Sequence, residues 1–466
     1  MKSTKQIFVA TTLSLGITLA ANFQAGAQTP VQRPILRSNA LDALTYGAWG
    51  DCVHDDAPSI NAAILQLENT SAGEGASHSG ELYLPKPPGG CYLVKSPIVL
   101  TGQGGSADYN YSISLVGEGR GVTVIRAGAA IDSVLLKDAQ WNRGHTITDI
   151  TFDANGHAQH AIHVQNGSEI RFTRVEGLNA KLDDLELDEG GEDFVTDSFF
   201  FNDSTFPEYN IHILAKSTDN ELTNNVAWNA SYANIAEETS STNHFVGNHA
   251  YGYGKGSNPY DACPVYSFVT AFQSIWVDNQ SDCSKEAGFL IDNWSSNVTA
   301  NVIQGAQNHG ICMTPQAGSE TIVGNQMFFS DAQGNSTTPA VANAIVQGKM
   351  VGGKVSCAGP GARNPTWASS SNFGAGSVVM GNTPASNENL WNAVYSTTAN
   401  QTTSIGVGTT QPQAVLDVNG DVRVGAASSV CDSSLAGDIR FDASTHTFLG
   451  CNGTAWVAFT ATTPAK

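Results

Sequence analysis

Charged residues are scarce in this chain, and basic residues are the scarcer kind. Of the 466 residues, 14% are charged, whereas ordinary soluble proteins carry about 25%. The 42 acidic residues outnumber the 22 basic residues, so the formal net charge is −20. Binding to nucleic acid or to an anionic membrane needs a basic footprint, which this composition does not supply. The sequence therefore predicts no nucleic-acid partner.

Long apolar runs are also missing, except near the start. Ile7 to Ala21 is mostly apolar but short for a membrane span, and no other segment approaches about 20 apolar residues. Two lysines precede this run, and Ala-Gly-Ala at 25–27 follows it, which is typical of a secretory signal peptide. An uncleaved anchor is the alternative. The sequence predicts a signal peptide at 1–27, no membrane span, and a secreted or cell-surface protein that passes through a periplasm in transit.

The cysteines form no CxxC pair and lie in no histidine-rich cluster with zinc spacing. All eight follow the predicted signal peptide, and an even count in an exported chain favours disulfides. Sequence neighbours suggest three pairs, Cys52–Cys91, Cys263–Cys283 and Cys431–Cys451. Cys312 and Cys357 are what remains, and other connectivities stay open.

A repeat with a period near 23 residues organises the middle of the chain. An apolar residue is followed three positions later by Asn in five places: Leu222/Asn225, Phe245/Asn248, Trp276/Asn279, Val298/Asn301 and Ile322/Asn325. Coils of this length can pair their strands with the coils above and below, which satisfies the strand edges. A propeller needs repeats of about 40 residues. The sequence therefore predicts an all-β, right-handed single-stranded parallel β-helix, with Leu222, Phe245, Val298 and Ile322 in one interior column.

The rest of the chain is assigned around this repeat. Helical periodicity predicts one helix at Asp56 to Glu68, with Asp56 capping it. Lys181 to Asn210 and Tyr251 to Ser267 interrupt the repeat, so we expect two exterior loops that wall a cleft. The expected domains are the signal peptide at 1–27, a linker at 28–41, the β-helix at 42–380, a linker at 381–403 and a C-terminal segment at 404–466.

Residues 46–64 contain a Gly-Asp-Cys sequence followed by Asp55-Asp56. They resemble the opening motif of the pectate-lyase-3 group, which includes glycoside-hydrolase-28-like and rhamnogalacturonase/epimerase-like β-helix proteins and many phage tailspikes. Cys52 stands where that group has the second Gly of its GDG sequence. The Glu-Leu-Tyr-Leu-Pro sequence at 81–85 is similar to the strand that opens the β-helix. The resemblance spans roughly 42–380 and implies the fold, but the fold carries several chemistries.

The C-terminal segment carries a second resemblance. Residues 404–420 are similar to the segment that precedes the trimeric tip of tail fibres and bacterial surface fibres. The stretch from Cys431 to Cys451 reads as a small disulfide-closed hairpin module. This resemblance implies a homotrimer, or at least self-association through residues 400–466.

A β-helix groove suits an extended polymer, and a spacing near 22 residues brings distant side chains together on adjacent coils. Hydrolysis needs two carboxyl groups, whereas lysis of a uronic acid needs a cation, a base and an acid. The full polygalacturonase motif set is missing. The predicted catalytic residues are Glu237, Glu238 and Asp292. The predicted substrate-binding residues are His163, His212, Asn234, Trp294, Tyr251, Tyr253 and Lys255.

The predicted chemistry requires no cofactor, and Ca²⁺ is a candidate ligand for the acidic stretch from Asp183 to Asp193. Two functions stay open. The first is a secreted polysaccharide-degrading β-helix protein, a glycoside hydrolase or polysaccharide lyase, acting on an extended neutral or acidic polysaccharide. The second is a non-catalytic trimeric surface or fibre protein that binds glycans.

Overall fold

The computed structural model describes residues 40–69, 78–100, 111–137, 142–203, 207–214, 216–252, 263–292, 295–306, 309–314, 317, 320–329, 343–347, 349–351, 354–356, 378–380, 383–384, 405–407, 414, 416–418, 424 and 430–459. The expected signal peptide, most of the first linker, Cys357 and the expected site residues Tyr253, Lys255 and Trp294 lie outside these residues. No helix of the described part is long and apolar enough to cross a membrane.

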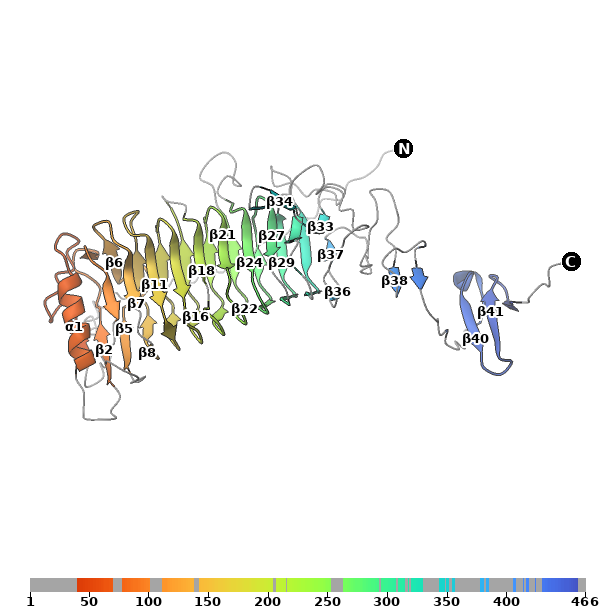
Figure 1. Ribbon diagram of the computed structural model, residues 1–466, viewed down its shortest axis with the longest axis horizontal. Helices are drawn as coiled ribbons and strands as arrows, with labels where there is room; N and C mark the ends of the chain where they lie inside the picture. The colour runs from red at the N-terminus through yellow and green to blue at the C-terminus, as the bar shows by residue number, and fades with distance from the viewer. Residues whose placement is uncertain are drawn as a thin grey trace, which may run out of the picture. The chain divides into compact units, whose positions relative to one another are not determined.

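Three long parallel sheets form the predicted β-helix (Figure 1), because each coil contributes one strand to each sheet in turn. Sheet 1 consists of β1 (Ala40–Asp42), β2 (His78–Tyr83), β5 (Tyr111–Val116), β9 (Thr146–Thr148), β13 (Arg171–Thr173), β16 (Phe194–Thr196), β19 (Glu221–Thr223), β22 (His244–Val246), β25 (Ile275–Val277), β28 (Asn297–Thr299), β31 (Thr321–Val323) and β36 (Val378–Met380). Sheet 2 consists of β3 (Tyr92–Val94), β6 (Val124–Ala127), β10 (Thr151–Asp153), β14 (Glu176–Leu178), β17 (Phe199–Phe201), β20 (Val226–Trp228), β23 (His249–Tyr251), β26 (Gln280–Ser281), β29 (Val302–Ala306), β32 (Gln326–Phe329) and β37 (Thr383–Pro384). Sheet 3 consists of β4 (Ile98–Leu100), β7 (Ser133–Lys137), β11 (His160–Gln165), β15 (Asp183–Asp188), β18 (Tyr209–Ile213), β21 (Ala233–Glu237), β24 (Tyr266–Thr270), β27 (Ala287–Ile291), β30 (His309–Met313) and β33 (Asn343–Gln347).

The predicted interior column is confirmed in sheet 1. Leu222 pairs with Phe245, which pairs with Trp276, and the register continues through Val298 to Ile322. All five side chains are fully buried. The ring of Trp276 stacks on that of Phe245, with centroids 3.6 Å apart. Stacked apolar columns of this kind supply the main stabilisation of the fold, since each coil alone buries too little surface.

The repeated asparagines form a side-chain ladder along the same turn of successive coils. The Nδ2 of Asn225 donates to Asn248, and the series continues through Asn279 and Asn301 to Asn325, at 2.9–3.0 Å. Each Oδ1 also accepts the backbone N–H of the preceding ladder residue. The second Nδ2 hydrogen reaches a backbone carbonyl, as from Asn248 to Leu222 at 2.8 Å. Asn recurs there because its amide satisfies three buried backbone and side-chain groups at once.

The predicted helix is α1 (Ala57–Asn69), at the N-terminal end of the solenoid (Figure 1). Its expected apolar face, Ile60, Ala63, Ile64 and Leu67, is buried in the common core. The expected side-chain cap is wrong. The carbonyl of Asp56 accepts the first helical hydrogen bond from Ile60, but its carboxylate accepts the N–H groups of Trp49 and Gly50. The backbone of the opening motif therefore binds the Asp56 carboxylate, which is not available to cap the helix.

Disulfides join Cys52 to Cys91, Cys263 to Cys283 and Cys431 to Cys451, as the sequence suggested. Cys52 has φ of 60°, a conformation that favours glycine. This explains why the resembling group has Gly at that position. The N–H of Cys52 donates to the carbonyl of Cys91 at 3.0 Å, so the disulfide lies beside a strand-like contact.

The stretch from Lys181 to Asn210 is not an exterior loop, and that prediction is wrong. It contains β15, β16 and β17 and therefore builds a coil of the solenoid. Its ladder position is occupied by Ser198, whose Oγ accepts the N–H of Val175 and whose own N–H donates to Asn225. A serine in place of asparagine concealed this coil in the sequence. The second expected loop runs between β23 and β24, and its residues 253–262 lie outside the described part.

The smaller elements include three two-stranded pairs: β8 (Asn142–Arg143) with β12 (Gly167–Ser168), β34 (Lys349–Val351) with β35 (Lys354–Ser356), and β38 (Ile405–Val407) with β39 (Leu416–Val418). The C-terminal module contains η2 (Ser433–Leu435) and the antiparallel strands β40 (Ile439–Asp442), β41 (Thr447–Cys451) and β42 (Trp456–Ala458). It is a small disulfide-closed sheet, as its sequence indicated.

Candidate functional site

Ionisable side chains gather on the outward face of sheet 3. In this sheet His160 pairs with Asp183, which pairs with Tyr209, and His163 pairs with Glu186, which pairs with His212. Between these positions the chain places apolar residues in the interior core, such as Ile162, Leu185 and Ile211. We call the following residues the histidine–carboxylate cluster: His160, His163, Asp183, Glu186, Tyr209 and His212, with Asp132 and Glu238 at its rims.

Asp183 lies between two imidazoles. Its Oδ2 is 3.2 Å from Nδ1 of His160, and its Oδ1 is 3.4 Å from Nδ1 of His212. All three residues are buried. Burial opposes ionisation, but the neighbouring imidazoles outweigh it and hold the pKa of Asp183 well below its usual value. Asp183 is therefore an anion at neutral pH.

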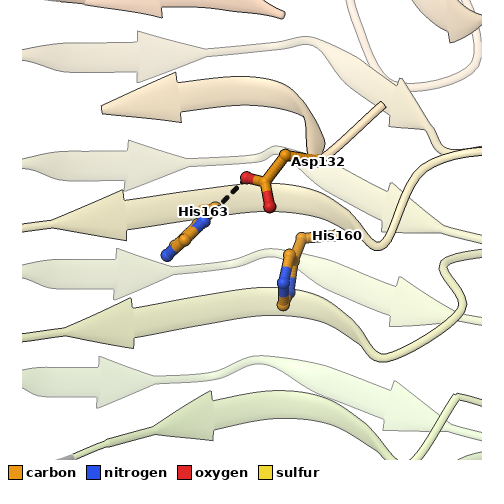
Figure 2. A group of neighbouring side chains, drawn as sticks. All are labelled: Asp132, His160 and His163. Carbon is orange, nitrogen blue, oxygen red and sulfur yellow. Dashed lines mark hydrogen bonds and ion pairs between the residues drawn. The ribbon is translucent and has the colours of Figure 1, made fainter. Parts of the chain in front are cut away.

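His163 connects the rim to the centre of the cluster. Figure 2 marks the contact between its ring and the carboxylate of Asp132, and the Nδ1 to Oδ2 distance is 2.9 Å. Its Nε2 lies 3.1 Å from Oε1 of Glu186. Burial lowers the pKa of His163 and raises the pKa of Glu186 to about 7. A buried imidazole and a buried carboxyl group thus face each other across adjacent strands.

The other rim is more open to solvent. The side chain of Glu238 is 43% exposed, and its Oε1 accepts a hydrogen bond from the hydroxyl of Tyr209 at 2.6 Å. Its Oε2 is 3.7 Å from Nε2 of His212, whose ring stacks on Tyr209. His212, followed by Tyr209, lowers the pKa of Glu238. Burial opposes the charged form of His212, but Asp183 and Glu238 raise its pKa to about 9.

Two predicted catalytic residues occupy comparable positions on the solenoid. Glu238 follows the last residue of β21, and Asp292 follows the last residue of β27, while β24 pairs with both strands. Burial, followed by the charges of Glu238 and Asp292, raises the pKa of Tyr232 to about 12. Both carboxylates therefore lie within electrostatic range of the Tyr232 hydroxyl.

Glu237, the third predicted catalytic residue, points into the interior of the solenoid. It pairs with Ile213 of the core, and its carboxyl group accepts hydrogen bonds from the Asn243 amide at 2.7 Å and from the N–H of Ala271. Burial raises the pKa of Glu237 to about 7. An enclosed carboxyl group has no access to a polymer on the outer surface, so we leave Glu237 out of the proposed catalytic set.

The predicted substrate-binding residues do not all lie at one place in the structure. His163 and His212 occupy one column of sheet 3, with Glu186 between them. Asn234 is fully buried, and its amide bonds to the backbone of Ala230 and Tyr251 instead of joining the cluster. Tyr251 belongs to sheet 2, where its ring contacts Trp228 edge to face. The structure therefore does not bring Asn234 or Tyr251 to the histidine–carboxylate cluster.

Sequence reasoning missed Asp132, His160 and Tyr209, and interpreted Asp183 and Glu186 as part of a loop. A signal was present. The pairs His160/His163, Asp183/Glu186 and Tyr209/His212 each contain two polar residues three positions apart, and the pairs recur at steps of 23 and 26 residues. The strand register omits Ala161 and Asp184, so positions three apart both face outward. An ideal strand alternates its faces, which is why this spacing did not indicate one surface.

The cluster also meets the geometric requirements of a metal site. Two groups of its side chains, Asp132/His160/His163 and His160/Asp183/Glu186, have ligand atoms within 4.8 Å of one another, and a third group combines His163 and Glu186 with the neighbouring Asp188. The expected calcium loop is instead strand β15. Asp184 of that strand is turned away and accepts hydrogen bonds from Asn202 and Asn210. Asp184 therefore does not join Asp183 and Glu186 on the outward face of the strand.

Comparison with known families gives a direct match to the solenoid. Residues 40–258 match the family model described as rhamnogalacturonase A/epimerase, pectate lyase-like. The resemblance predicted from the opening motif is confirmed over this range, which includes the histidine–carboxylate cluster. No curated protein is similar in sequence to the chain.

Solved structures with similar folds come from several sources. The ORF18 protein of Geobacillus virus E2 is 17% identical with a TM-score of 0.41, and the match covers 63% of this chain and 61% of that protein. The A-module of a mannuronan C-5 epimerase from Azotobacter vinelandii is 16% identical with a TM-score of 0.42, covering 65% and 95%. PfbA, a surface adhesin of Streptococcus pneumoniae, is 14% identical with a TM-score of 0.41, covering 62% and 85%.

Proposed function

We propose that this chain hydrolyses glycosidic bonds of an extended polysaccharide bound across the outward face of sheet 3. The observation that carries the proposal is the pair Glu238 and Asp292, at equivalent ends of β21 and β27. One strand, β24, separates them, and two strand spacings amount to about 9–10 Å. Inverting glycosidases hold their two carboxyl groups about 6.5–9.5 Å apart, with a water between. This backbone spacing lies at the upper end of that range, so the pair is better suited to hydrolysis with inversion at the anomeric carbon than to retention, which needs about 5–5.5 Å between the carboxyl groups.

The surroundings of Glu238 suit the role of general base. His212 and Tyr209 keep its carboxylate ionised, and both contacts also fix its orientation. In this mechanism Glu238 accepts a proton from the attacking water, and Asp292 donates a proton to the departing sugar oxygen. Tyr209 and His212 are positioning residues, because they act on the carboxylate rather than on the sugar.

Hydrolysis is favoured over elimination by the charges of the cluster. Elimination from a uronic acid needs a cation that neutralises the sugar carboxylate. The imidazoles of the cluster already face carboxylates at 2.9–3.8 Å. Among the described ion pairs, no Lys or Arg contacts these residues. The family description names a rhamnogalacturonase, and we carry over from it the polysaccharide class of substrate.

The test is a screen of the purified protein against neutral and acidic polysaccharides, with proton NMR of the first product. The proposal expects new reducing ends that start in the inverted anomeric configuration. Ultraviolet absorbance from unsaturated uronates would show elimination and overturn the mechanism. Retained configuration would exclude the Glu238/Asp292 pair, and absence of cleavage across the screen would refute the enzymatic function.

A specific observation supports self-association as a second function. In the C-terminal module the register of β40, β41 and β42 places several apolar side chains on one face of the sheet. These are Ile439, Phe441, Phe448, Val457 and Phe459, all of which are partly or largely exposed. Soluble monomers rarely leave such a face open. We propose that it joins copies of this chain, as the resemblance to trimeric fibres implied, and light scattering that gives a monomer mass at micromolar concentration would refute this.

The proposed location is extracellular. The disulfides are stable in oxidising compartments, and the N-terminal sequence is typical of a secretory signal. Detection of the protein in the culture medium or on the cell surface would support export, and retention in the cytoplasm would contradict it.

A further inference from the structure

We propose that the histidine–carboxylate cluster binds one divalent transition-metal ion, of which Zn²⁺ is the representative. Its ligands are His160, Asp183 and Glu186, and His163 is the fourth candidate. The proposal is independent of the proposed hydrolysis, because Glu238 and Asp292 are not among the ligands.

The distances between the donor atoms are close to those of ligands around one ion. Nδ1 of His160 lies 3.2 Å from Oδ2 of Asp183 and 3.8 Å from Oε2 of Glu186. Atoms bound to one metal at about 2.0–2.2 Å in tetrahedral or octahedral geometry are about 3.0–3.5 Å apart. The ligand atoms of these three residues all fall within 4.8 Å of one another.

These close approaches do not have the geometry of hydrogen bonds. Nδ1 of His160, Nε2 of His163 and Oδ1 of Asp183 are buried, and none has a hydrogen-bond partner. The three residues are 5%, 7% and 3% exposed. Buried ionisable groups are ordinarily hydrogen-bonded, paired or bound to a metal. A cation held by His160, Asp183 and Glu186 would satisfy Nδ1 of His160.

His163 adds a second, independent observation. Its Nδ1 faces the carboxylate of Asp132 at 2.9 Å (Figure 2). When Nδ1–H donates to Asp132, Nε2 carries a lone pair and points at Oε1 of Glu186, 3.1 Å away. Two acceptors at this distance repel unless a proton or a metal cation lies between them. Metal-binding histidines commonly donate their other N–H to a carboxylate in this manner, which fixes the ring.

The types of ligand atom indicate which class of metal ion the cluster binds. Ca²⁺ prefers six to eight oxygen ligands. Two imidazoles with two carboxylates suit Zn²⁺ and related transition metals instead. The acidic stretch that suggested calcium in the sequence contributes Asp183 and Glu186, and the neighbouring strand β11 contributes the nitrogen donors.

The test uses the tag-free protein after dialysis against a chelator, with calorimetric titration of Zn²⁺ and Ca²⁺. We expect one Zn²⁺ per chain, and binding at least about 100-fold weaker in His160→Ala and in Glu186→Gln. Asp132→Asn, which removes the partner of His163, should weaken binding about 10–100-fold. His249→Ala is the matched control. His249 also faces a carboxylate, that of Asp282 at 2.7 Å, but lies on sheet 2. Its loss should leave the affinity unchanged.

A spectroscopic measurement keeps the test decisive if a variant fails to fold. Co²⁺ added to the wild-type protein should give the visible absorption of nitrogen and oxygen coordination, and Zn²⁺ should abolish it. Absence of stoichiometric Zn²⁺ binding would overturn the proposal. Binding that persists unchanged in both ligand variants would assign it to other surface histidines, and binding of Ca²⁺ alone would exclude the imidazole ligands.

Discussion

The side chain of Asn248 lies directly against that of Asn279, and its Nδ2 donates to Oδ1 of Asn279 at 3.0 Å. The same oxygen accepts the backbone N–H of Asn248 at 2.9 Å. One oxygen thus joins two consecutive coils through a side chain and a main chain. Asn248 plays the same part for Asn225.

We expect Asn248→Ala to lower the free energy of unfolding by about 2–5 kcal/mol. The substitution leaves the buried N–H and amide of Asn225 without their acceptor, and each unsatisfied buried group costs about 1–3 kcal/mol. Urea denaturation followed by circular dichroism measures the effect. His244→Ala, at an exposed position of β22, should change stability by less than about 0.5 kcal/mol. Equal losses in the two variants would contradict a special role for the ladder.

Substitutions of Trp276 test core packing alone, because they remove no hydrogen bond. Its side chain is fully buried, and its Nε1 has no hydrogen-bond partner. Trp276→Ala should cost about 3–5 kcal/mol because it leaves a large cavity beneath Phe245. Trp276→Phe keeps an aromatic ring in the column and loses no hydrogen bond, so it should cost less than about 1.5 kcal/mol. Thermal unfolding would separate the two, and equal destabilisation would show that the indole N–H is needed.

Glu237 should make stability depend on pH. Its pKa is about 7 in the folded protein, against an ordinary value near 4.5, so the folded state holds a proton that the unfolded state has released. The free energy of unfolding should therefore fall as pH rises from about 4.5 to about 7, by about 3 kcal/mol from this group. Urea denaturation at pH 5 and pH 8 measures the slope. Glu237→Gln should remove the contribution of this group and leave a smaller slope, and an unchanged slope would refute the assignment.

The proposed catalytic pair predicts matched losses of activity. Once a substrate is known, Glu238→Gln and Asp292→Asn should each reduce kcat at least about 100-fold while the chain stays folded. Glu221→Gln, at an exposed position of sheet 1, is the control and should retain full activity. Rates within a few-fold of the wild type in both test variants would locate the chemistry elsewhere.

Tyr209→Phe should shift the acidic limb of the pH–rate profile without abolishing activity. The Tyr209 hydroxyl donates to Glu238 at 2.6 Å, and this contact contributes to the lowered pKa of Glu238. Removing the donor raises the pKa, so Glu238 protonates at higher pH and kcat/KM begins to fall at higher pH. A profile identical to that of the wild type would show that Glu238 does not act as the base.

The solenoid could be predicted from the sequence because its repeat consists of apolar residues and asparagines that have the same structural role in each coil. Apolar residues followed by Asn mark one corner of each coil, and the spacing identifies them without any contact information. The coil at Ser198 escaped because a hydroxyl replaces the amide there and still satisfies its neighbours.

The candidate site was harder to predict for a physical reason. Its members share a surface because strands of sheet 3 depart from ideal alternation. This departure hides the meaning of the recurring polar pairs, since residues three positions apart on an ideal strand face opposite sides. Glu237 and Glu238 show the consequence: they are adjacent in sequence, yet one enters the core and the other faces solvent. Assignment of either to a surface needs the register of the neighbouring strands.

The asparagine ladder also bears on how this protein can change in length over evolution. From Asn225 to Asn325, every contact between neighbouring coils of the ladder uses the same donors and acceptors, so each of these coils presents the same connecting chemistry on its two sides. Duplication or deletion of a complete coil therefore preserves every contact along the ladder, whereas gain or loss of part of a coil shifts the amides out of register. Lineages of this chain should differ by multiples of one coil, with the ladder continuous across each junction.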